Sequence, residues 1–469
     1  MEFTQFLDAK VRPGALAEWI PAVPGGLGSW HRDPRGTSHN HEQHLRAAHD
    51  YRVRTQREGG REAWLGVAVE FDEQISLAAV RTAVLAWINR HEVLRTHVTL
   101  VGPRTERYTT DPGTVHLRMT RVGWYRDADL LLEQIGGSFD RATTPMHWPA
   151  YRFATVARAH SFTLLFAADH SLVDGYSLIN SQYELRELYA AAVERRAPQL
   201  PPTGSYIDFS GAERVAADSA DDRHTAVAVW DEFLAGRTDL PSFALLPTPP
   251  PARPTAPGEH TAPAQHSRTS RLLDDATAEA FTRRCTDLGG SLIGGILAAT
   301  ALVYRRHSGA DRFATLMPRH TRNHARFHGA LGWFVALAPV TVDISDDPSF
   351  PTALERVMVS LDRAREGAAL PLLRLATILG FDPEPKFVVS FMDTRAVPGA
   401  AAADEGAAQA LRSHAYADDE FYLWVNRTPS GLRMHARFPA AESAQDVGAV
   451  LQGFIDDFAD LLASIAVGG

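Results

Sequence analysis

Residues 162–175 of the chain read FTLLFAADHSLVDG, and this stretch decides how the rest of the sequence is interpreted. Its first seven residues are apolar except for one threonine, which predicts a buried strand. A polar turn containing Asp169, His170 and Asp174 follows, and residues 176–195 are predicted to form a helix. Side chains on a turn between a strand and a helix lie beyond the edge of the sheet, where ligand sites are often built.

The turn offers residue types that suit acid–base chemistry. A histidine at the end of a buried strand can be held neutral and presented to a cavity as a general base. Asp174 is better suited to holding the turn closed, and Gly175 leaves room for backbone or ligand to approach closely. The alternative interpretation is a capped turn in which His170 only completes a hydrogen-bond network. The pattern alone does not separate the two, because a single histidine in a turn is a weak motif.

The length and composition of the chain limit its architecture. Its 469 residues exceed the roughly 250–300 at which one hydrophobic core stops growing, so two lobes are expected. Hydrophobic residues make up 45% and charged residues 22%, which is typical of a folded, soluble protein and excludes global disorder, collagen and coiled coil. The formal net charge of −9 argues against a nucleic-acid-binding protein, which usually carries a basic surface.

Cysteine usage and the apolar stretches indicate a reducing compartment. Cys285 is the only cysteine, so no internal disulfide can form. The first ten residues, MEFTQFLDAK, lack the basic and apolar regions of a secretory signal. The longest apolar stretch, residues 291–304, is shorter than the ~20 residues that span a bilayer and is predicted to be a buried core helix. We therefore expect a cytoplasmic protein without a membrane span.

Helices and strands alternate on both sides of two proline-rich segments. Residues 199–204 (QLPPTG) and 247–263 (PTPPPARPTAPGEHTAP) are predicted to be a linker and an irregular surface loop. The patterns around them predict an α/β fold. Strands are expected at residues 65–71, 93–101, 151–156, 313–317, 333–342 and 387–392, with a hairpin at 420–437. Helices are expected at residues 37–54, 77–89, 128–135, 276–288, 291–307 and 352–366, and at the C-terminus.

A second motif precedes the turn and gives it a context. Residues 90–96, RHEVLRT, would alone be a charged helix end. Together with DHSLVDG at residues 169–175, they resemble the RHExLRTxF and HHxxxDG motifs of the condensation-domain superfamily. In that superfamily, nonribosomal-peptide condensation domains and polyketide-associated (Pap-type) acyltransferases are related to chloramphenicol acetyltransferase. Val98 stands where the first motif usually has phenylalanine.

Further matches follow the order of the family along most of the chain. They are residues 43–46 (QHLR), 204–209 (GSYIDF), 294–298 with 308–311 (GGILA and SGAD), 318–322 (Pro-x-x-x-Arg) and 332–335 (GWFV), which leads to Pro339 and Val340. The chain is therefore identified as a member of this superfamily.

One position departs from the family pattern. Asp169 replaces the first histidine of HHxxxDG, whereas the second, which the family implicates in the chemistry, is retained as His170. Asp169 therefore does not by itself imply an inactive site. The sequence DHxxxDG with the other matches is most similar to Pap-type acyltransferases that acylate sugars, since peptide condensation domains more often keep both histidines.

The resemblance implies two chloramphenicol-acetyltransferase-like lobes that form a V around a central substrate tunnel. Residues 1–200 would form the lobe that carries DHxxxDG, and residues 201–469 the lobe with a floor loop and a latch-like hairpin. His170 would act as the catalytic base, and Asp174 would form a structural salt bridge with Arg322. The catalytic motif is implied to contain His170, Asp174 and Gly175, and the tunnel lining Gln43, His44, Asp169, Trp333 and Ser390.

The reaction that the resemblance implies is acyl transfer. The donor is a thioester on coenzyme A or on the phosphopantetheine of a carrier protein, and the acceptor is a hydroxyl or an amine. No bound cofactor and no metal are expected, and the chain is expected to act as a monomer in specialised metabolism. Two alternatives stay open: a condensation enzyme that forms an amide between carrier-bound substrates, and a non-catalytic recruitment domain.

Two further clusters give weaker indications. The pattern HxHxxH at His39, His41 and His44 lacks the additional ligands of a zinc site, so an edge of the acceptor side of the tunnel is favoured. A basic cluster could meet donor phosphates, because arginine pairs well with phosphate. A solvated loop is the favoured interpretation for all of its members except Arg322. The cluster comprises Arg319, His320, Arg322, His324, Arg326 and His328.

Overall fold

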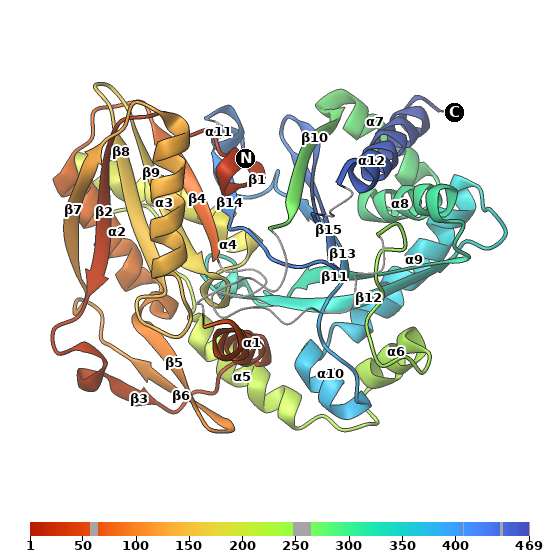
Figure 1. Cartoon of the computed structure of the whole chain (residues 1–469), viewed down its shortest axis with the longest axis horizontal. Coiled ribbons are helices and arrows are strands. Elements are labelled where there is room, and N and C mark those ends of the chain that lie inside the picture. The colour runs from red at the N-terminus through yellow and green to blue at the C-terminus, as the bar shows by residue number, and fades with distance from the viewer. Residues whose placement is uncertain (57–63, 247–263, 407, 441–443, 469) are drawn as a thin grey trace.

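The computed structural model describes residues 1–56, 64–246, 264–406, 408–440 and 444–468. The proline-rich segment 247–263, predicted to be an irregular loop, lies outside these residues. Two lobes stand side by side, the first coloured red to yellow and the second green to blue in Figure 1. The prediction of a two-lobed α/β fold is confirmed.

The first lobe is built on a seven-stranded sheet with the order β1-β14-β4-β9-β8-β2-β7. Every residue of its central strand β9 is buried, as the apolar run in the sequence predicts. The strands of this sheet are β1 (Glu2–Gln5), β2 (Ala15–Ala22), β4 (Trp64–Phe71), β7 (His116–Trp124), β8 (Tyr151–Ala157), β9 (Phe162–Asp169) and β14 (Gln409–Arg412). A small separate sheet contains β3 (His31–Asp33), β5 (Thr96–Val101) and β6 (Arg104–Thr109).

Helices cover both faces of the first sheet. Helix α2 (Leu77–Arg90) packs against α4 (Gly175–Glu194) on one face, and α3 (Ala128–Ala142) covers the other. Helix α1 (His39–Thr55) and helix α5 (Tyr206–Asp218) lie side by side below the gap between the lobes in Figure 1.

The second lobe is built on a six-stranded sheet with the order β10-β16-β15-β13-β11-β12. Its strands are β10 (His266–Asp274), β11 (Arg312–His320), β12 (Val335–Asp343), β13 (Phe387–Asp393), β15 (Phe421–Thr428) and β16 (Gly431–Phe438). One face forms a large apolar core with four helices, and two further helices form a smaller core. The helices of this lobe are α6 (Thr225–Leu234), α7 (Asp275–Asp287), α8 (Leu292–Ser308), α9 (Phe350–Gly367), α10 (Leu372–Leu379) and α12 (Ala444–Val467).

Helix α8 contains the longest apolar stretch and is almost entirely buried, as predicted for a core helix. Among the described residues, no single helix is long and apolar enough for a membrane span. Only α7 and α8 taken together pass on length and composition, and the chain bends by 92° between them.

One segment crosses from the second half of the chain to the first lobe. Strand β14 pairs in parallel with β1 and antiparallel with β4, so it extends the first sheet. The short helix α11 (Ala400–Glu405) precedes it and contacts α4. The division expected at residue 200 stays a prediction, but the first sheet is incomplete without residues 409–412.

Three predicted elements differ from the structure for identifiable reasons. The strand expected at residues 93–101 begins at Thr96, because a 3₁₀ turn (Glu92–Arg95) precedes it. Helix α3 runs past its expected end through Gly136 and Gly137, whose helix-weakening character hid its length. Trp333, expected in a strand, lies before β12, because the next backbone N–H donates to Asp174 instead of joining the sheet.

Candidate active site

Two aspartates of the DHSLVDG sequence act as N-caps, one for a 3₁₀ turn and the other for a helix. Oδ1 of Asp169 accepts a hydrogen bond from the backbone N–H of Ser171 at 2.9 Å and caps the 3₁₀ turn His170–Leu172. Oδ1 of Asp174 accepts from the N–H of Ser177 at 2.7 Å and caps α4. Short polar side chains are preferred at such caps because they satisfy helix N–H groups that lack an internal partner. The caps fix the backbone on both sides of His170.

Three rings from distant parts of the chain meet at this turn. The His170 ring lies 4.3 Å from the Trp333 ring and 6.5 Å from the His44 ring, measured between centroids. The edge of the His44 ring packs on Trp333 at 5.8 Å. His44 comes from α1 and Trp333 from the segment before β12, so the partly exposed His170 lies where the two lobes meet.

Asp169, which replaces the first histidine of the family motif, contacts a histidine of helix α1. Nε2 of His44 lies 2.9 Å from Oδ2 of Asp169, which is fully buried. Asp169 therefore uses one oxygen to cap the turn and the other to hold it against α1. Both His44 and Asp169 belong to the residues implied to line the tunnel, and the structure brings them together.

Asp174 and Arg322 form a buried ion pair between the two lobes. Nη1 and Nη2 of Arg322 lie 2.7 and 3.0 Å from the two carboxylate oxygens, and both side chains are 2% exposed. The N–H of Phe334 also donates to Asp174 at 2.9 Å. Burial raises the pKa of Asp174, but the charge and hydrogen bonds of Arg322 outweigh it and leave that pKa below its ordinary value.

Helix α1 contacts the second lobe through two residues that precede His44, one by a helical turn and one directly. The side-chain amide of Asn40 donates to the carbonyl of Val335 at 2.6 Å, and that of Gln43 donates to the carbonyl of Pro383 at 3.1 Å. These bonds place one face of α1 against the segments that lead into β12 and β13. Gln43 thus contacts the second lobe and is not part of the ring cluster itself.

Gly175 lies close to strand β13. A Cβ atom added at Gly175 would lie 2.9 Å from Cε of Met392, which is too close for two carbon atoms. Ser390 is two residues earlier on the same face of this strand, and it is buried opposite Trp424 of β15. Ser390 therefore shares a face of β13 with Met392, and Met392 is the residue of this strand that approaches Gly175.

Sequence reasoning missed several residues that hold the site. Ser177 stands three residues after Asp174, a spacing typical of an N-cap, so the sequence contained a signal for it. Asn40, Met392 and the Phe334 N–H have no such signal, because their partners lie far away along the chain.

The three histidines of the HxHxxH pattern have different surroundings. Nε2 of His39 lies 2.9 Å from Asp218, and His44 pairs with Asp169. His41 is buried, and burial together with the charge of Arg107 lowers its pKa well below the usual value. Within the described parts of the chain, no three His, Cys, Asp or Glu side chains are placed to hold a metal ion.

Cys285 is an unfavourable nucleophile. It is buried in α7, and burial raises the pKa of its thiol to about 12. Since the thiolate is the reactive form of cysteine, this group stays unreactive near neutral pH.

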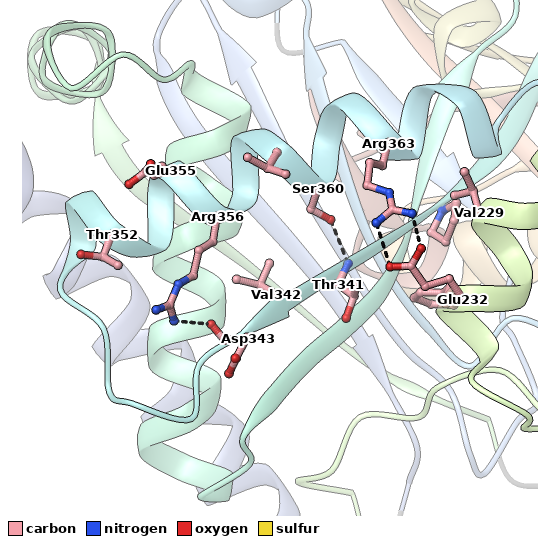
Figure 2. A pocket seen from close by; sticks show the side chains of 13 residues that line it. Val229, Glu232, Thr341, Val342, Asp343, Thr352, Glu355, Arg356, Ser360 and Arg363 are labelled. Atoms are coloured by element: carbon pink, nitrogen blue, oxygen red, sulfur yellow. Dashed lines mark hydrogen bonds and ion pairs between the residues drawn. The ribbon is translucent and has the colours of Figure 1, made fainter.

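A recess of about 530 Å³ lies elsewhere, between α6, α9 and β12 of the second lobe (Figure 2). Both of its arginines are engaged: Arg363 pairs with Glu232, and Arg356 donates to the backbone carbonyl of Asp343. None of the motif residues lines this recess, so the chemistry of the motif does not extend into it.

The sequence and the fold place the chain among known proteins. The condensation domain family matches residues 54–459, and the chain belongs to this family. Acyltransferase PapA3 of Mycobacterium tuberculosis is 27% identical over 405 residues, which cover 82% of this chain and 82% of that protein. Trehalose-2-sulfate acyltransferase PapA2 of Mycobacterium bovis is 24% identical over 477 residues, covering 95% and 97%.

Solved structures share the fold. A PapA2 acyl transferase superposes with a TM-score of 0.87 at 21% identity and covers all of both chains. The first condensation domain of the calcium-dependent antibiotic synthetase superposes with a TM-score of 0.70 at 18% identity, over 93% of this chain and 97% of that one. The chain is accordingly an enzyme, an acyltransferase of the condensation-domain type.

Proposed function

We propose that this enzyme transfers an acyl group from a thioester of coenzyme A or of a carrier protein to a hydroxyl or amine acceptor, with His170 as the general base. A hydroxyl is the favoured acceptor, because the similar PapA2 protein is a trehalose-2-sulfate acyltransferase and sugars offer hydroxyl groups. The position of His170 between the lobes, with its ring 4.3 Å from Trp333, is the observation that carries the proposal.

The reaction needs a base at that position. A neutral hydroxyl attacks a thioester poorly while it holds its proton, so the imidazole of His170 removes the proton as the oxygen attacks the carbonyl carbon. The new C–O bond forms, the C–S bond breaks, and the proton passes from the imidazolium to the departing sulfur. Holding donor and acceptor together in one orientation contributes further, up to roughly 7–11 kcal/mol in favourable cases.

Asp169 fits this function better than a non-catalytic role. Its replacement of the family histidine was the only sequence feature compatible with a recruitment domain. Both of its carboxylate oxygens are engaged, one by Ser171 and one by His44, and both contacts hold the turn that presents His170.

The test is a transfer assay with a matched pair of histidine variants. The purified protein is incubated with acyl-coenzyme A or an acylated carrier protein and a panel of alcohols and amines, and the products are identified by intact mass. We expect His170→Ala to lower kcat by about 10²–10⁴-fold. His116→Ala, which removes an exposed histidine from β7, should leave kcat unchanged. Full activity of His170→Ala would exclude the role of His170 as the base.

A further inference from the structure

A group of cationic side chains surrounds the end of β11 and the segment that follows it. We name residues 319–328 the basic loop; its basic side chains besides Arg322 are Arg319, His320, His324, Arg326 and His328. All of these are exposed except Arg319, which is half-buried. The sequence favours a solvated loop here, but three structural observations indicate a binding site.

The first observation concerns charge. Among the residues that the structure describes, none of these five side chains forms an ion pair with a carboxylate, although the whole chain carries a net charge of −9. The guanidinium of Arg326 lies instead over the ring of Phe327, 4.6 Å from its centroid. Positive charge that the protein's own carboxylates do not neutralise favours the binding of an anionic ligand.

The second observation concerns proximity. Partial desolvation of the ring and the charges of Arg322, Arg319 and His328 lower the pKa of His320, and Asp174 opposes them. Asp174 is already engaged by both terminal nitrogens of Arg322. The arginines Arg319 and Arg322 therefore act on the same imidazole, and an anion beside it would be attracted to both charges.

The third observation is that the basic loop is fixed and lies next to the motif. The carbonyl of Arg326 accepts from the N–H of Gly204 at 2.6 Å, and that of His328 accepts from the Asn180 amide at 2.8 Å. The ring of Tyr176, the residue after Gly175, lies 6.5 Å from the His320 ring. The guanidinium of Arg322 lies 4.8 Å from the centroid of the same Tyr176 ring. One aromatic side chain thus separates the exposed edge of the basic loop from the catalytic turn.

We propose that the basic loop binds the phosphate groups of coenzyme A in the acyl donor, with Arg319 and Arg326 as its main ligands. This rests on the proposed function, because it assigns a donor to the same site. Guanidinium groups bind phosphate through charge-assisted, often bidentate hydrogen bonds. Phosphates held at the surface would place the thioester arm toward the turn that carries His170. A sulfate on a sugar acceptor has similar chemistry, and the experiment separates the two.

The experiment compares two donors, the second of which lacks the phosphates and the adenosine of coenzyme A. Arg319→Ala/Arg326→Ala is assayed with acyl-coenzyme A and with the matching acyl-pantetheine, which carries no phosphate. We expect KM for acyl-coenzyme A to rise at least about tenfold, while kcat/KM for acyl-pantetheine stays within twofold of the parent enzyme. Arg118→Ala, which removes an exposed arginine from β7, is the matched control and should change neither value. Arg319→Lys/Arg326→Lys should regain part of the affinity.

Other results would overturn the proposal. An equal loss with both donors would show a structural role, and a rise in KM for the acceptor alone would assign the basic loop to an anionic acceptor. Direct binding separates this proposal from the proposed function. Calorimetry should show that His170→Ala still binds coenzyme A like the parent protein, whereas the double alanine variant binds it at least tenfold more weakly. Equal binding by all three proteins would exclude the phosphate site even if acyl transfer is observed.

Discussion

Asp169 and His44 lie 125 residues apart in sequence, and Oδ2 of the first is 2.9 Å from Nε2 of the second. Their contact joins the turn that carries His170 to helix α1, which in turn bonds to the second lobe through Asn40 and Gln43. The residue that departs from the family motif is therefore part of the structure that positions the proposed base.

Removing the Asp169 carboxylate should loosen the catalytic turn. Asp169→Ala removes the acceptor of the Ser171 N–H and the contact with His44, and an unsatisfied buried polar group typically costs about 1–3 kcal/mol. We expect this loss of unfolding free energy in urea titration, together with a lower kcat. Asp169→Asn keeps an acceptor for one of the two partners and should lose less. Restoring the family histidine with Asp169→His should not improve activity; a gain would contradict the pairing described here.

The Asp174–Arg322 pair should contribute strongly to stability. Arg322→Ala leaves a carboxylate that is 2% exposed without its countercharge, and breaking such a pair typically costs about 3–5 kcal/mol. Glu232→Ala breaks the exposed Arg363–Glu232 pair and should cost less than about 1 kcal/mol, which makes it the control. Equal losses in chemical denaturation would show that the buried pair has no special role.

The Asp174–Arg322 pair should make the protein less stable as the pH becomes acidic. The pKa of Asp174 is held below its ordinary value in the folded state, so its contribution is present above the unfolded pKa of about 4. The contribution is lost as the pH falls through the lower folded pKa. Arg322→Ala should therefore flatten the loss of stability below pH 4, measured as unfolding free energy against pH.

Glu213 should make stability depend on pH near neutrality. This half-buried side chain lies on the face of α5 that contains buried Tyr206 and Ser210, and burial raises its pKa to about 7. Between pH 4.5 and about 7 the folded state holds the proton and the unfolded state does not, so stability falls as the pH rises. Glu213→Gln should equal the parent protein at pH 4 and exceed it by up to about 3 kcal/mol at pH 8. A constant difference between the two proteins across this range would exclude the raised pKa.

Local patterns explain which parts of the fold were predictable. The buried strand, the polar turn and the helix at residues 162–194 follow from hydrophobic periodicity and caps within a few residues of each other. Strands β1 and β2 were missed, because β1 is only four residues long and β2 contains Pro21 within its eight residues. Their place in the sheet is set by β14 and by β7 and β8, which are distant in sequence.

The site was predictable where a known motif supplied the long-range information. The Asp174–Arg322 pair spans 148 residues, and only the resemblance to the family joined the two. The His44–Asp169 pair is absent from the motif pattern, so neither periodicity nor resemblance indicated it. Contacts between distant segments depend on how the helices and sheets pack against one another, and the sequence near each residue does not record that.

The backbone at Gly332 should tolerate no side chain. A Cβ atom there would lie 2.4 Å from Cγ of Tyr206, whose ring is buried and whose hydroxyl lies 3.0 Å from the Ser38 hydroxyl. Because this ring has little room to move, Gly332→Ala should displace the segment that carries Trp333 and reduce its contact with His170. Overpacking of this kind typically costs about 1–3 kcal/mol, and we expect a matching fall in the midpoint of thermal unfolding and a lower kcat.

The same substitution, glycine to alanine, should stabilise the protein at a second position. Gly448 lies inside α12, and a Cβ atom there would meet no other atom within 4 Å. Since alanine is favoured over glycine in a helix by roughly 0.5–1 kcal/mol, Gly448→Ala should raise the unfolding free energy and leave kcat unchanged. If Gly332→Ala were as stable and active as Gly448→Ala, the close packing of the segment before β12 on Tyr206 would not position the catalytic rings.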